Sequence, residues 1–205
     1  MARRNRRWLR RHLDDGWVRR ARTEGKRSRA AFKLTQIFQE YKLSISRNAV
    51  VVDLGCAPGS WCQELVRLAP HGMVVGIDLL PVEPVEGATI LQHDFLTPAG
   101  RRAIDEELAG RPIDLLLSDM APEMSGNRIV DQAAVERLNE ATIAFCSGRL
   151  AAGGIMLMKS FMGDGFDRVR TSLRDGFDRV RVVKPPASRR ASRELYLLAT
   201  GWRAA

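Results

Sequence analysis

The stretch VVDLGCAPGSW at residues 51–61 joins a run of β-branched residues to a turn rich in glycine and proline. We expect a buried strand, a tight turn and then a helix, which is the local arrangement of many nucleotide-cofactor sites. The dinucleotide fingerprint G-x-G-x-x-G is absent, because the turn holds only Gly55 and Gly59. Pro58 also lacks a backbone N–H that could bind a phosphate. The turn therefore predicts a cofactor other than a dinucleotide.

Apolar runs and helical patterns alternate along most of the chain. The apolar runs have the length and the β-branched or leucine-rich composition of strands that are covered on both faces. We expect such strands at residues 48–55, 72–80, 88–95, 112–120 and 153–161. We expect helices at residues 29–42, 60–70 and 131–154. This alternation predicts an α/β fold with a mostly parallel, doubly wound, Rossmann-like sheet.

Local signals mark the ends of these predicted helices. Ser28 is a candidate N-cap for the first helix, because its hydroxyl can accept from a free backbone N–H. Pro70 ends the second helix, since proline cannot continue a helical hydrogen-bond ladder. The pair Gly153 and Gly154 is expected to end the third.

The last part of the chain departs from the alternation. Segments 177–183 and 194–202 have the composition of strands, and the ten residues between them leave no room for a crossover helix. Strands joined by so short a connection are antiparallel. We therefore expect an antiparallel C-terminal hairpin at the edge of the sheet.

The heptapeptide DGFDRVR occurs twice, at residues 164–170 and 175–181, and we expect two different structures for it. The first copy continues into TSLRDG and places three apolar residues on one helical face: Phe166, Val169 and Leu173. Gly176 can end that helix. In the second copy, Val180 and Val182 alternate with arginines as in a half-buried strand. The local propensity is the same in both copies, so context must decide.

The net charge of +9 comes from the first 29 residues, which hold 12 of the 33 Lys and Arg but 3 of the 24 Asp and Glu. Such a basic arm on a neutral body is typical of binding to a polyanion. Trp8 and Trp17 lie among the arginines, where they could stack on unpaired bases. A solvated tail and an organelle-targeting peptide are the alternatives. We expect an RNA-binding arm at 1–25 and a single domain at 26–205.

The remaining composition argues against several classes of protein. The three cysteines lack CxxC spacing and the three histidines are scattered, so we expect neither a disulfide framework nor a metal site. No apolar run reaches the roughly 18 residues of a membrane span. We therefore expect a cytoplasmic, monomeric protein that does not act at a membrane.

Four aspartates stand at or near the ends of predicted strands: Asp53, Asp78, Asp94 and Asp119. In a doubly wound sheet these ends form the edge where ligands bind. Asp78 follows the glycine turn by nearly the ~20 residues expected of a carboxylate that binds ribose hydroxyls. A row of carboxylates would repel a pyrophosphate but suits a ribose, an amine and a positive centre. S-adenosylmethionine carries all three, so it fits better than a nicotinamide dinucleotide.

Taken together, five segments resemble the FtsJ/RrmJ family of ribosomal RNA 2′-O-methyltransferases. The segments that carry the resemblance are RSRAAFKL (27–34), VVDLGCAPGSW (51–61), SDMAPEMSG (118–126), LMKSF (157–161) and SRELYLLA (192–199). Their order along nearly the whole chain is far more specific than the glycine turn alone. The resemblance implies methylation of a ribose, most of all of a uridine, in the RNA of the large ribosomal subunit or its precursor.

The resemblance also implies which residues act. It implies a catalytic tetrad at Lys33, Asp119, Lys159 and Glu194. It implies cofactor contacts at Gly59, Trp61, Asp78, Asp94 and Asp119. A ribose 2′-hydroxyl needs such a set, because it is a poor nucleophile until its proton leaves. Whether Lys159 takes that proton or holds the oxygen as a charged group stays open.

Other functions remain as alternatives. Transfer RNA is the second candidate substrate, and a ribosome-assembly factor that binds RNA could keep this fold without catalysis. A nicotinamide oxidoreductase would need the phosphate-binding turn that is missing here. Enzymes that methylate base amines carry an aromatic residue after proline, which SDMAP lacks, and cytosine C5 enzymes need a nucleophilic cysteine in a loop.

Overall fold

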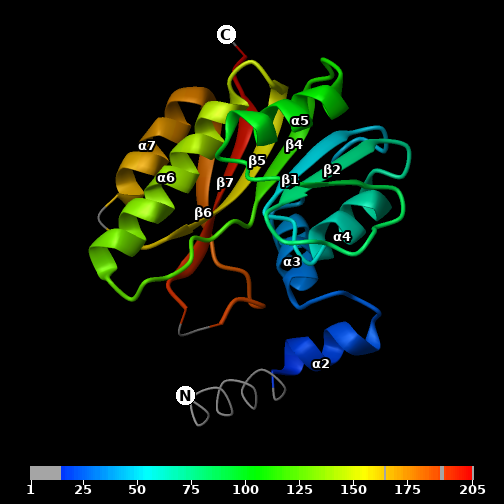
Figure 1. The fold of residues 1–205 in the computed structure, drawn as a ribbon, viewed down its shortest axis with the longest axis horizontal. Helices are drawn as coiled ribbons and strands as arrows, with labels where there is room; N and C mark the ends of the chain where they lie inside the picture. The colour runs from blue at the N-terminus through cyan, green and yellow to red at the C-terminus, as the bar shows by residue number, and fades with distance from the viewer. Residues whose placement is uncertain (1–14, 164, 190–191, 205) are drawn as a thin grey trace.

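A seven-stranded sheet with the order β3-β2-β1-β4-β5-β7-β6 runs through the centre of the computed structural model, which describes residues 15–163, 165–189 and 192–204 (Figure 1). The five strands from β3 to β5 are parallel to one another, and β7 pairs antiparallel with both β5 and β6. The strands are β1 (Val50–Leu54), β2 (Met73–Asp78), β3 (Thr89–Gln92), β4 (Ile113–Ser118), β5 (Leu150–Phe161), β6 (Phe177–Val183) and β7 (Glu194–Trp202). The predicted parallel sheet and its antiparallel C-terminal hairpin are confirmed.

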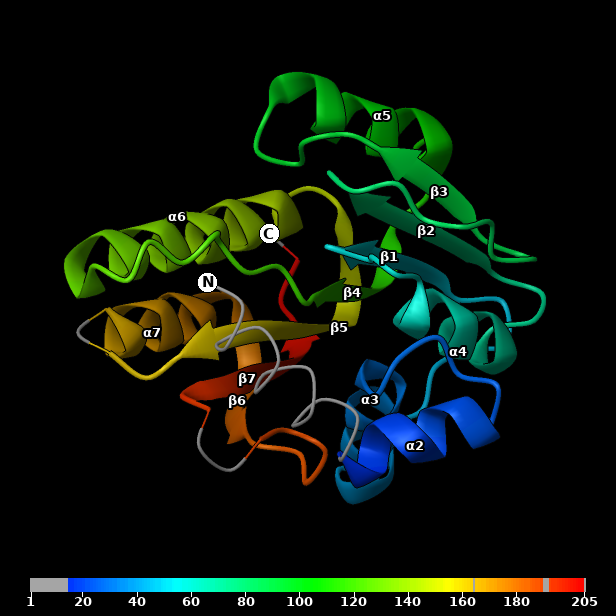
Figure 2. The same ribbon diagram turned by 60° about the horizontal axis from the view of Figure 1, so that its bottom comes forward.

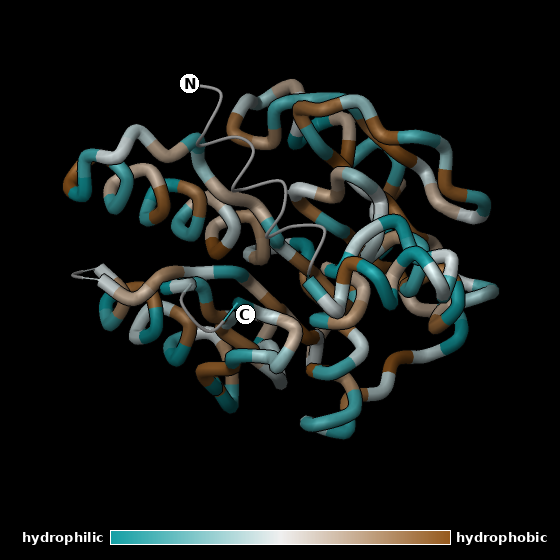
Figure 3. The backbone as a smooth tube through the Cα atoms, turned by 90° about the horizontal axis from the view of Figure 1, so that it is seen from below, coloured by the Kyte–Doolittle hydropathy of each residue, from teal (hydrophilic) through white to brown (hydrophobic). Residues whose placement is uncertain are grey.

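Helices cover both faces of the sheet (Figure 2). On one face lie α3 (Ala30–Glu40) and α4 (Ser60–Leu68), whose apolar side chains pack in one buried cluster with alternate residues of the strands. On the other face lie α5 (Pro98–Leu108), α6 (Arg128–Cys146) and α7 (Phe166–Gly176). Hydrophobic and hydrophilic segments alternate along these helices, as expected of helices that bury one side (Figure 3).

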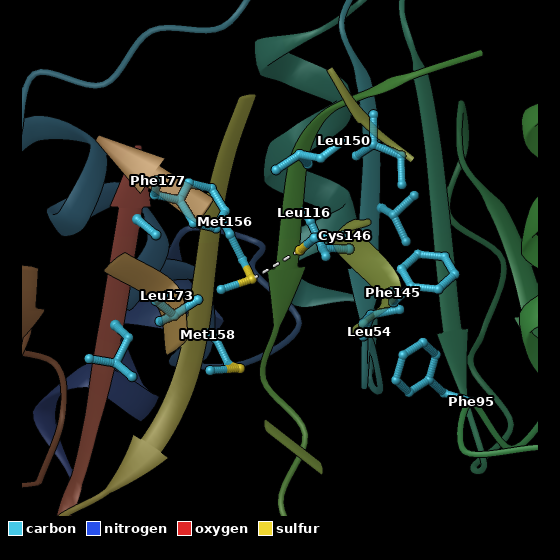
Figure 4. Close-up of a cluster of buried hydrophobic side chains, with 14 of the residues drawn as sticks. Leu54, Phe95, Leu116, Phe145, Cys146, Leu150, Met156, Met158, Leu173 and Phe177 are labelled. Carbon is cyan, nitrogen blue, oxygen red and sulfur yellow. Dashed lines mark hydrogen bonds between the residues drawn. The ribbon is translucent and has the colours of Figure 1, made fainter. Parts of the chain in front are cut away.

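The core between the sheet and helices α5, α6 and α7 is closely packed (Figure 4). The rings of Phe95 and Phe145 meet edge to face with centroids 5.4 Å apart. The sulfur atoms of Cys146 and Met156 lie 3.4 Å apart, which ties the last turn of α6 to β5. This packing holds β4 and β5 firmly side by side, and their carboxyl ends carry predicted site residues.

The two copies of DGFDRVR adopt different structures, as predicted. The first copy enters α7, which buries Phe166, Val169 and Leu173 and ends at Gly176. The second copy enters β6. One detail differs from the expectation, because Val180 is half-buried but Val182 is 42% exposed. Since β6 is an edge strand, less of it is covered than of a central strand.

The predicted end of the third helix is wrong. The helix α6 stops at Cys146, and β5 already begins at Leu150. Gly148 has φ +71° in the short turn between them, and Leu150 pairs with Ile113 of β4. The two glycines expected to cap the helix instead lie inside β5, where the register with β4 shifts. Pairing with β4 outweighs the helical pattern of this alanine-rich segment.

The start of α3 also differs from its prediction. The N-cap residue is Arg29, and its side chain makes no cap hydrogen bond. Ser28 instead accepts a hydrogen bond from the N–H of Ala30 at 3.1 Å, and its hydroxyl lies 2.7 Å from that of Ser60. Ser28 therefore links the starts of α3 and α4.

Part of the basic arm forms a helix, α2 (Gly16–Thr23), which the sequence patterns did not predict. Asp15 caps α2 by accepting from the N–H of Trp17, and its carboxylate pairs with Arg29. The Trp17 ring packs 5.2 Å from the ring of Phe32, so this tryptophan helps to attach α2 to the domain. Trp8 and the remaining arginines of the arm before residue 15 lie outside the described residues.

The helix α5 is the second helix that was not predicted, although its start carries ordinary signals. Thr97 accepts from the N–H of Gly100 at 3.1 Å, and Pro98 occupies the first turn. Across the three described ranges of the chain, no helix combines the length and the apolar content needed to cross a bilayer.

Candidate active site

The turn after β1 brings two loops into close contact. Gly55 has φ +77°, a conformation that favours glycine. A Cβ atom there would lie 2.7–3.0 Å from atoms of Met120, which follows β4. Only a residue without a side chain allows this approach. The ends of β1 and β4 are thereby held together at the edge of the sheet.

A cavity of about 440 Å³ lies beside this contact and holds three of the predicted cofactor carboxylates. Asp78 comes from the end of β2, Asp94 from the segment after β3 and Asp119 from the end of β4. Backbone groups orient two of these side chains. The Asp78 carboxylate accepts from the N–H groups of Ala57 at 2.8 Å and Leu80 at 2.9 Å. Asp94 accepts from the following loop in the same way, at 2.8 Å.

Asp53 does not lie at this edge as expected. It sits within β1 and is only 1% exposed, on the face covered by α3 and α4. One carboxylate oxygen accepts from the thiol of Cys62 at 3.4 Å, and the other has no hydrogen-bond partner. Burial raises the pKa of Asp53 to about 7, and the charges of Asp119 and Asp78 act in the same direction. The Cys62 contact opposes this shift.

The raised pKa of Asp53 predicts how stability changes with pH. Between about pH 4 and 7 the folded protein keeps a proton that the unfolded chain has lost, so its stability falls as the pH rises through this range. Asp53→Asn has no such proton to lose. Relative to the wild type, this variant should gain up to about 3 kcal/mol in free energy of unfolding between pH 5 and pH 8.

Urea unfolding at both pH values measures this gain. The matched control is Asp178→Asn, whose side chain is 67% exposed, and its difference from the wild type should be nearly the same at pH 5 and 8. If the difference in stability between Asp53→Asn and the wild type is also the same at pH 5 and pH 8, Asp53 is ionised in the folded protein at both pH values, and the raised pKa is contradicted.

The four predicted catalytic residues lie together, although they come from four separate parts of the chain. Lys159 of β5 lies with its Nζ 3.1 Å from Oδ1 of Asp119, and it also donates to the Asp119 backbone carbonyl. Lys33 of α3 donates to Oε1 of Glu194, at the start of β7, at 2.6 Å. Both lysines are over 90% buried. Lysine is almost never buried to this degree unless it is paired with an opposite charge, as both lysines are here.

Tyr196 joins the two ion pairs into one network. Its hydroxyl donates to Oδ1 of Asp119 at 2.7 Å and accepts from Nζ of Lys33 at 3.1 Å. Burial raises the pKa of this phenol, and the adjacent carboxylates of Asp119 and Glu194 raise it further. The hydroxyl thus stays protonated and works as a bridge between the pairs.

Tyr196 was not among the predicted site residues, although the sequence contains a signal for it. It lies two residues after Glu194 on a predicted strand, so both side chains leave the same face of the sheet. In the structure Tyr196 stands directly opposite Lys159 in the β5–β7 ladder. Residues that face each other in this way are close enough to interact.

The other two predicted cofactor residues, Gly59 and Trp61, do not line the cavity that holds the three carboxylates. Trp61 is buried and lines a small inner cavity with Asp53 and Asp119, and its indole N–H donates to the carbonyl of Ala30. Gly59 lines neither cavity. It has φ +89°, and a Cβ there would lie 2.8 Å from the guanidinium of Arg27. The lack of a side chain at Gly59 leaves room for this arginine beside the turn, and the cofactor contact of Gly59 stays a prediction.

The cysteines are unsuited to covalent catalysis. All three thiols are buried. Burial raises the pKa of Cys146 to about 12, so almost none of it is thiolate near neutral pH. The described residues also contain no group of three or more His, Cys, Asp or Glu side chains arranged to hold a metal ion.

Comparison with known proteins agrees with this geometry. The family model described as FtsJ-like methyltransferase matches residues 26–202. The chain belongs to the FtsJ-like methyltransferase family. It is 46% identical over 199 residues to the protein of Alkalilimnicola ehrlichii named ribosomal RNA large subunit methyltransferase E, covering 97% of this chain and 95% of the relative. The protein of the same name from Halorhodospira halophila is 49% identical over 192 residues, covering 93% and 90%.

This FtsJ-like chain has the same fold as two solved structures. A ribosomal RNA methyltransferase, described as putative, from Plasmodium falciparum superposes with a TM-score of 0.77 at 27% identity. The match covers 87% of this chain and all of that one. A fibrillarin/Nop5p complex shares the fold alone, with a TM-score of 0.57 at 15% identity over 83% and 80% of the chains. The fold and the methyltransferase class predicted from the sequence are confirmed.

Proposed function

We propose that this FtsJ-like methyltransferase transfers a methyl group from S-adenosylmethionine to a ribose 2′-hydroxyl of large-subunit ribosomal RNA, most of all at a uridine. One observation carries the proposal. The network of Lys33, Glu194, Tyr196, Asp119 and Lys159 shares Asp119 with the cavity described above. We call this the acidic cavity, because Asp78, Asp94 and Asp119 line it. A group bound in that cavity would therefore lie next to the network.

The acidic cavity suits S-adenosylmethionine. Asp78 has both oxygens oriented by backbone N–H groups and would hold the ribose hydroxyls. Asp94 would accept from the adenine amine, and Asp119 would face the α-ammonium group. Three carboxylates around one cavity disfavour a pyrophosphate by charge repulsion. When bound, the cofactor supplies a methyl group on a positively charged sulfur.

The tetrad residues would act on the acceptor hydroxyl. The Lys159 amine contacts both the carboxylate and the backbone carbonyl of Asp119, so it is fixed at the edge of the sheet. From there it would take the 2′-proton or hold the oxygen in place. Lys33 and Glu194 would position the ribose from the other side of Tyr196. Holding the hydroxyl in line with the methyl group accounts for a large part of such catalysis.

Ribosomal RNA is favoured as the substrate because both bacterial relatives carry that substrate in their names. A chain that keeps all four charged groups paired, with both lysines buried, also favours an enzyme over a non-catalytic assembly factor. Transfer RNA is the alternative substrate. We further propose that the protein acts as a monomer in the cytoplasm, since a single chain supplies the whole network.

Mapping of 2′-O-methyl groups in total RNA, with and without the gene, tests the proposal directly. One large-subunit ribose should lose its methyl group in the deletion strain, and the purified protein should restore it with S-adenosylmethionine as the donor. Loss of a methyl group from transfer RNA alone would select the alternative substrate. An unchanged methylation map would contradict the proposal.

We propose that the basic arm supplies RNA affinity rather than chemistry. Deleting residues 2–14 removes six arginines and keeps the packed helix α2. If these arginines contact phosphates, the slope of log affinity against log salt should become shallower by about 4 to 5. Cofactor affinity should not change, because the acidic cavity lies within the domain.

Fluorescence anisotropy with labelled RNA at several salt concentrations gives this slope. An unchanged slope after the deletion would show that the arm makes no phosphate contacts. The same titration on a variant with six alanines in place of the arginines controls for the shortened chain.

A further inference from the structure

A second cavity, of about 470 Å³, lies at the end of β5, and we call it the β5 cavity. Its walls come from the loop after β4, the start of α6, the end of β5 and the segment before β7. Of the tetrad, Asp119 and Lys159 lie on these segments, and Glu194 directly follows the segment before β7. The β5 cavity belongs to none of the functions assigned above, yet the chain places it next to the proposed site of methyl transfer.

The geometry of β5 and β7 shows how close the β5 cavity lies to the tetrad. Phe161, which lines the cavity, follows Lys159 by two residues on β5, so both side chains leave the same face about 7 Å apart. Across the ladder, Phe161 stands opposite Glu194 of the tetrad. Arg193, another lining residue, directly precedes Glu194. A nucleobase is attached to the sugar carbon beside the one that bears the 2′-oxygen, so the base of a ribose held at Lys159 lies within reach of this cavity.

The walls of the β5 cavity have the chemistry that binds an unpaired base. Met124 is 55% exposed and Met162 is 53% exposed, and both line the cavity together with Phe161. Flexible thioether side chains and an aromatic ring make favourable contacts with flat aromatic groups. Arg128 and Arg193 add positive charge beside these apolar residues, as suits a polyanionic chain.

The shape of the β5 cavity is built into the fold. Asp131 in the first turn of α6 accepts from the N–H and the hydroxyl of Ser125, both at 2.7 Å, and from the N–H of Gly126 at 3.2 Å. These bonds fix the loop that carries Met124. On the opposite wall, Arg193 donates to the carbonyl of Met162 at 2.9 Å. Both methionines are thus held on anchored backbone.

We propose that the β5 cavity binds the unpaired nucleobase of the nucleotide whose ribose is methylated. This inference rests on the proposed function. The cavity is about as large as the acidic cavity, at 470 Å³ against 440 Å³, so it has room for one base and part of its sugar. Bound there, the base fixes the rotation of the nucleotide, and the 2′-hydroxyl is then presented to Lys159.

The test is a cycle of two proteins and two RNAs. The protein pair is the wild type and the double variant Met124→Ala/Met162→Ala, in which both truncated side chains are more than half exposed and so contribute little to the core. The RNA pair is an oligonucleotide that the wild type methylates and its abasic counterpart, which lacks only the base of the methylated nucleotide. Anisotropy titrations give the four dissociation constants.

The wild type should bind the intact RNA about 10-fold or more tightly than the abasic RNA, because stacking of one base contributes about that much. The double variant should bind both RNAs almost equally. The matched control is Leu68→Ala on α4, which is 40% exposed and does not line the β5 cavity; it should keep the wild-type ratio.

A double variant that keeps the full ratio would overturn the proposal, and so would a wild type that does not discriminate between the two RNAs. The first result would leave the methionines as a contact for some other molecule, such as a ribosomal protein. A wild type that methylates no RNA would instead overturn the proposed function, so the two failures are distinguishable.

Discussion

Replacing Lys159 with alanine should abolish methyl transfer, with a fall in kcat of about 10³-fold, while the affinities for cofactor and RNA change little. General acid–base groups contribute about 10²- to 10⁴-fold to a rate, and this amine is held 3.1 Å from the carboxylate of Asp119 at the edge of the sheet. Its contact with the acceptor matters mainly in the transition state, so the loss should appear in kcat rather than in binding.

Lys159→Arg separates the two roles left open for this lysine. A guanidinium keeps its charge at any working pH and cannot accept a proton. If Lys159 is the base, the arginine variant should be nearly as inactive as the alanine variant, and the rise of the wild-type rate with pH should disappear. If Lys159 holds the oxygen by charge, the arginine variant should keep substantial activity.

Single-turnover methyl transfer on saturating RNA measures these rates, and calorimetry on the same samples reports cofactor binding. The control is Lys42→Ala, an exposed lysine just beyond α3, which should react at the wild-type rate. Near-normal turnover by Lys159→Ala would contradict the catalytic assignment but would leave the fold and the acidic cavity untouched.

Asp119→Asn should impair both cofactor binding and catalysis, because this carboxylate belongs to the cavity and to the network. It pairs with Lys159 at 3.1 Å and accepts from Tyr196 at 2.7 Å. Hydrogen bonds to charged groups contribute about 1.5–3 kcal/mol, which corresponds to a roughly 10- to 100-fold loss of cofactor affinity. The fall in kcat should be of similar or larger size, since Lys159 loses the charge that holds it.

Comparing Asp119→Asn with Asp119→Ala separates charge from shape, because asparagine still accepts from Tyr196. Cofactor affinity is measured by calorimetry and the rate by single-turnover transfer, with the exposed Asp175→Asn on α7 as the control. Cofactor affinity that is unchanged in the asparagine variant would place the cofactor away from Asp119.

The strands were predictable because each is a short apolar run between turn residues, and burial on both faces leaves little choice of structure. The end of α6 was not predictable, because alanines continue the helical pattern beyond Cys146. Only the pairing of Leu150 with Ile113 ends the helix. That pairing joins residues far apart in the sequence. The two missed helices carry few large apolar residues, so periodicity alone does not reveal them.

The candidate site, like the fold, was predictable only in part. Spacing along the strands brought out the carboxylates, but the strand alternation was not applied to Asp53. It shares a face with Val51, which is buried under α3 and α4, so its side chain points into the interior rather than to the edge. Tyr196 was hidden because a tyrosine in an apolar strand looks like core. Its partners come from β4 and α3, which no local pattern connects.

The position of β7 in the sheet has a consequence for the timing of synthesis. This strand is the last to be made, yet it inserts between β5 and β6 and brings Glu194 to Lys33, 161 residues earlier in the chain. A nascent chain synthesised only as far as β6 has every residue that lines the acidic cavity but lacks Glu194 and Tyr196 of the charged network. If the network is catalytic as proposed, a chain that stops before β7 should therefore have no activity.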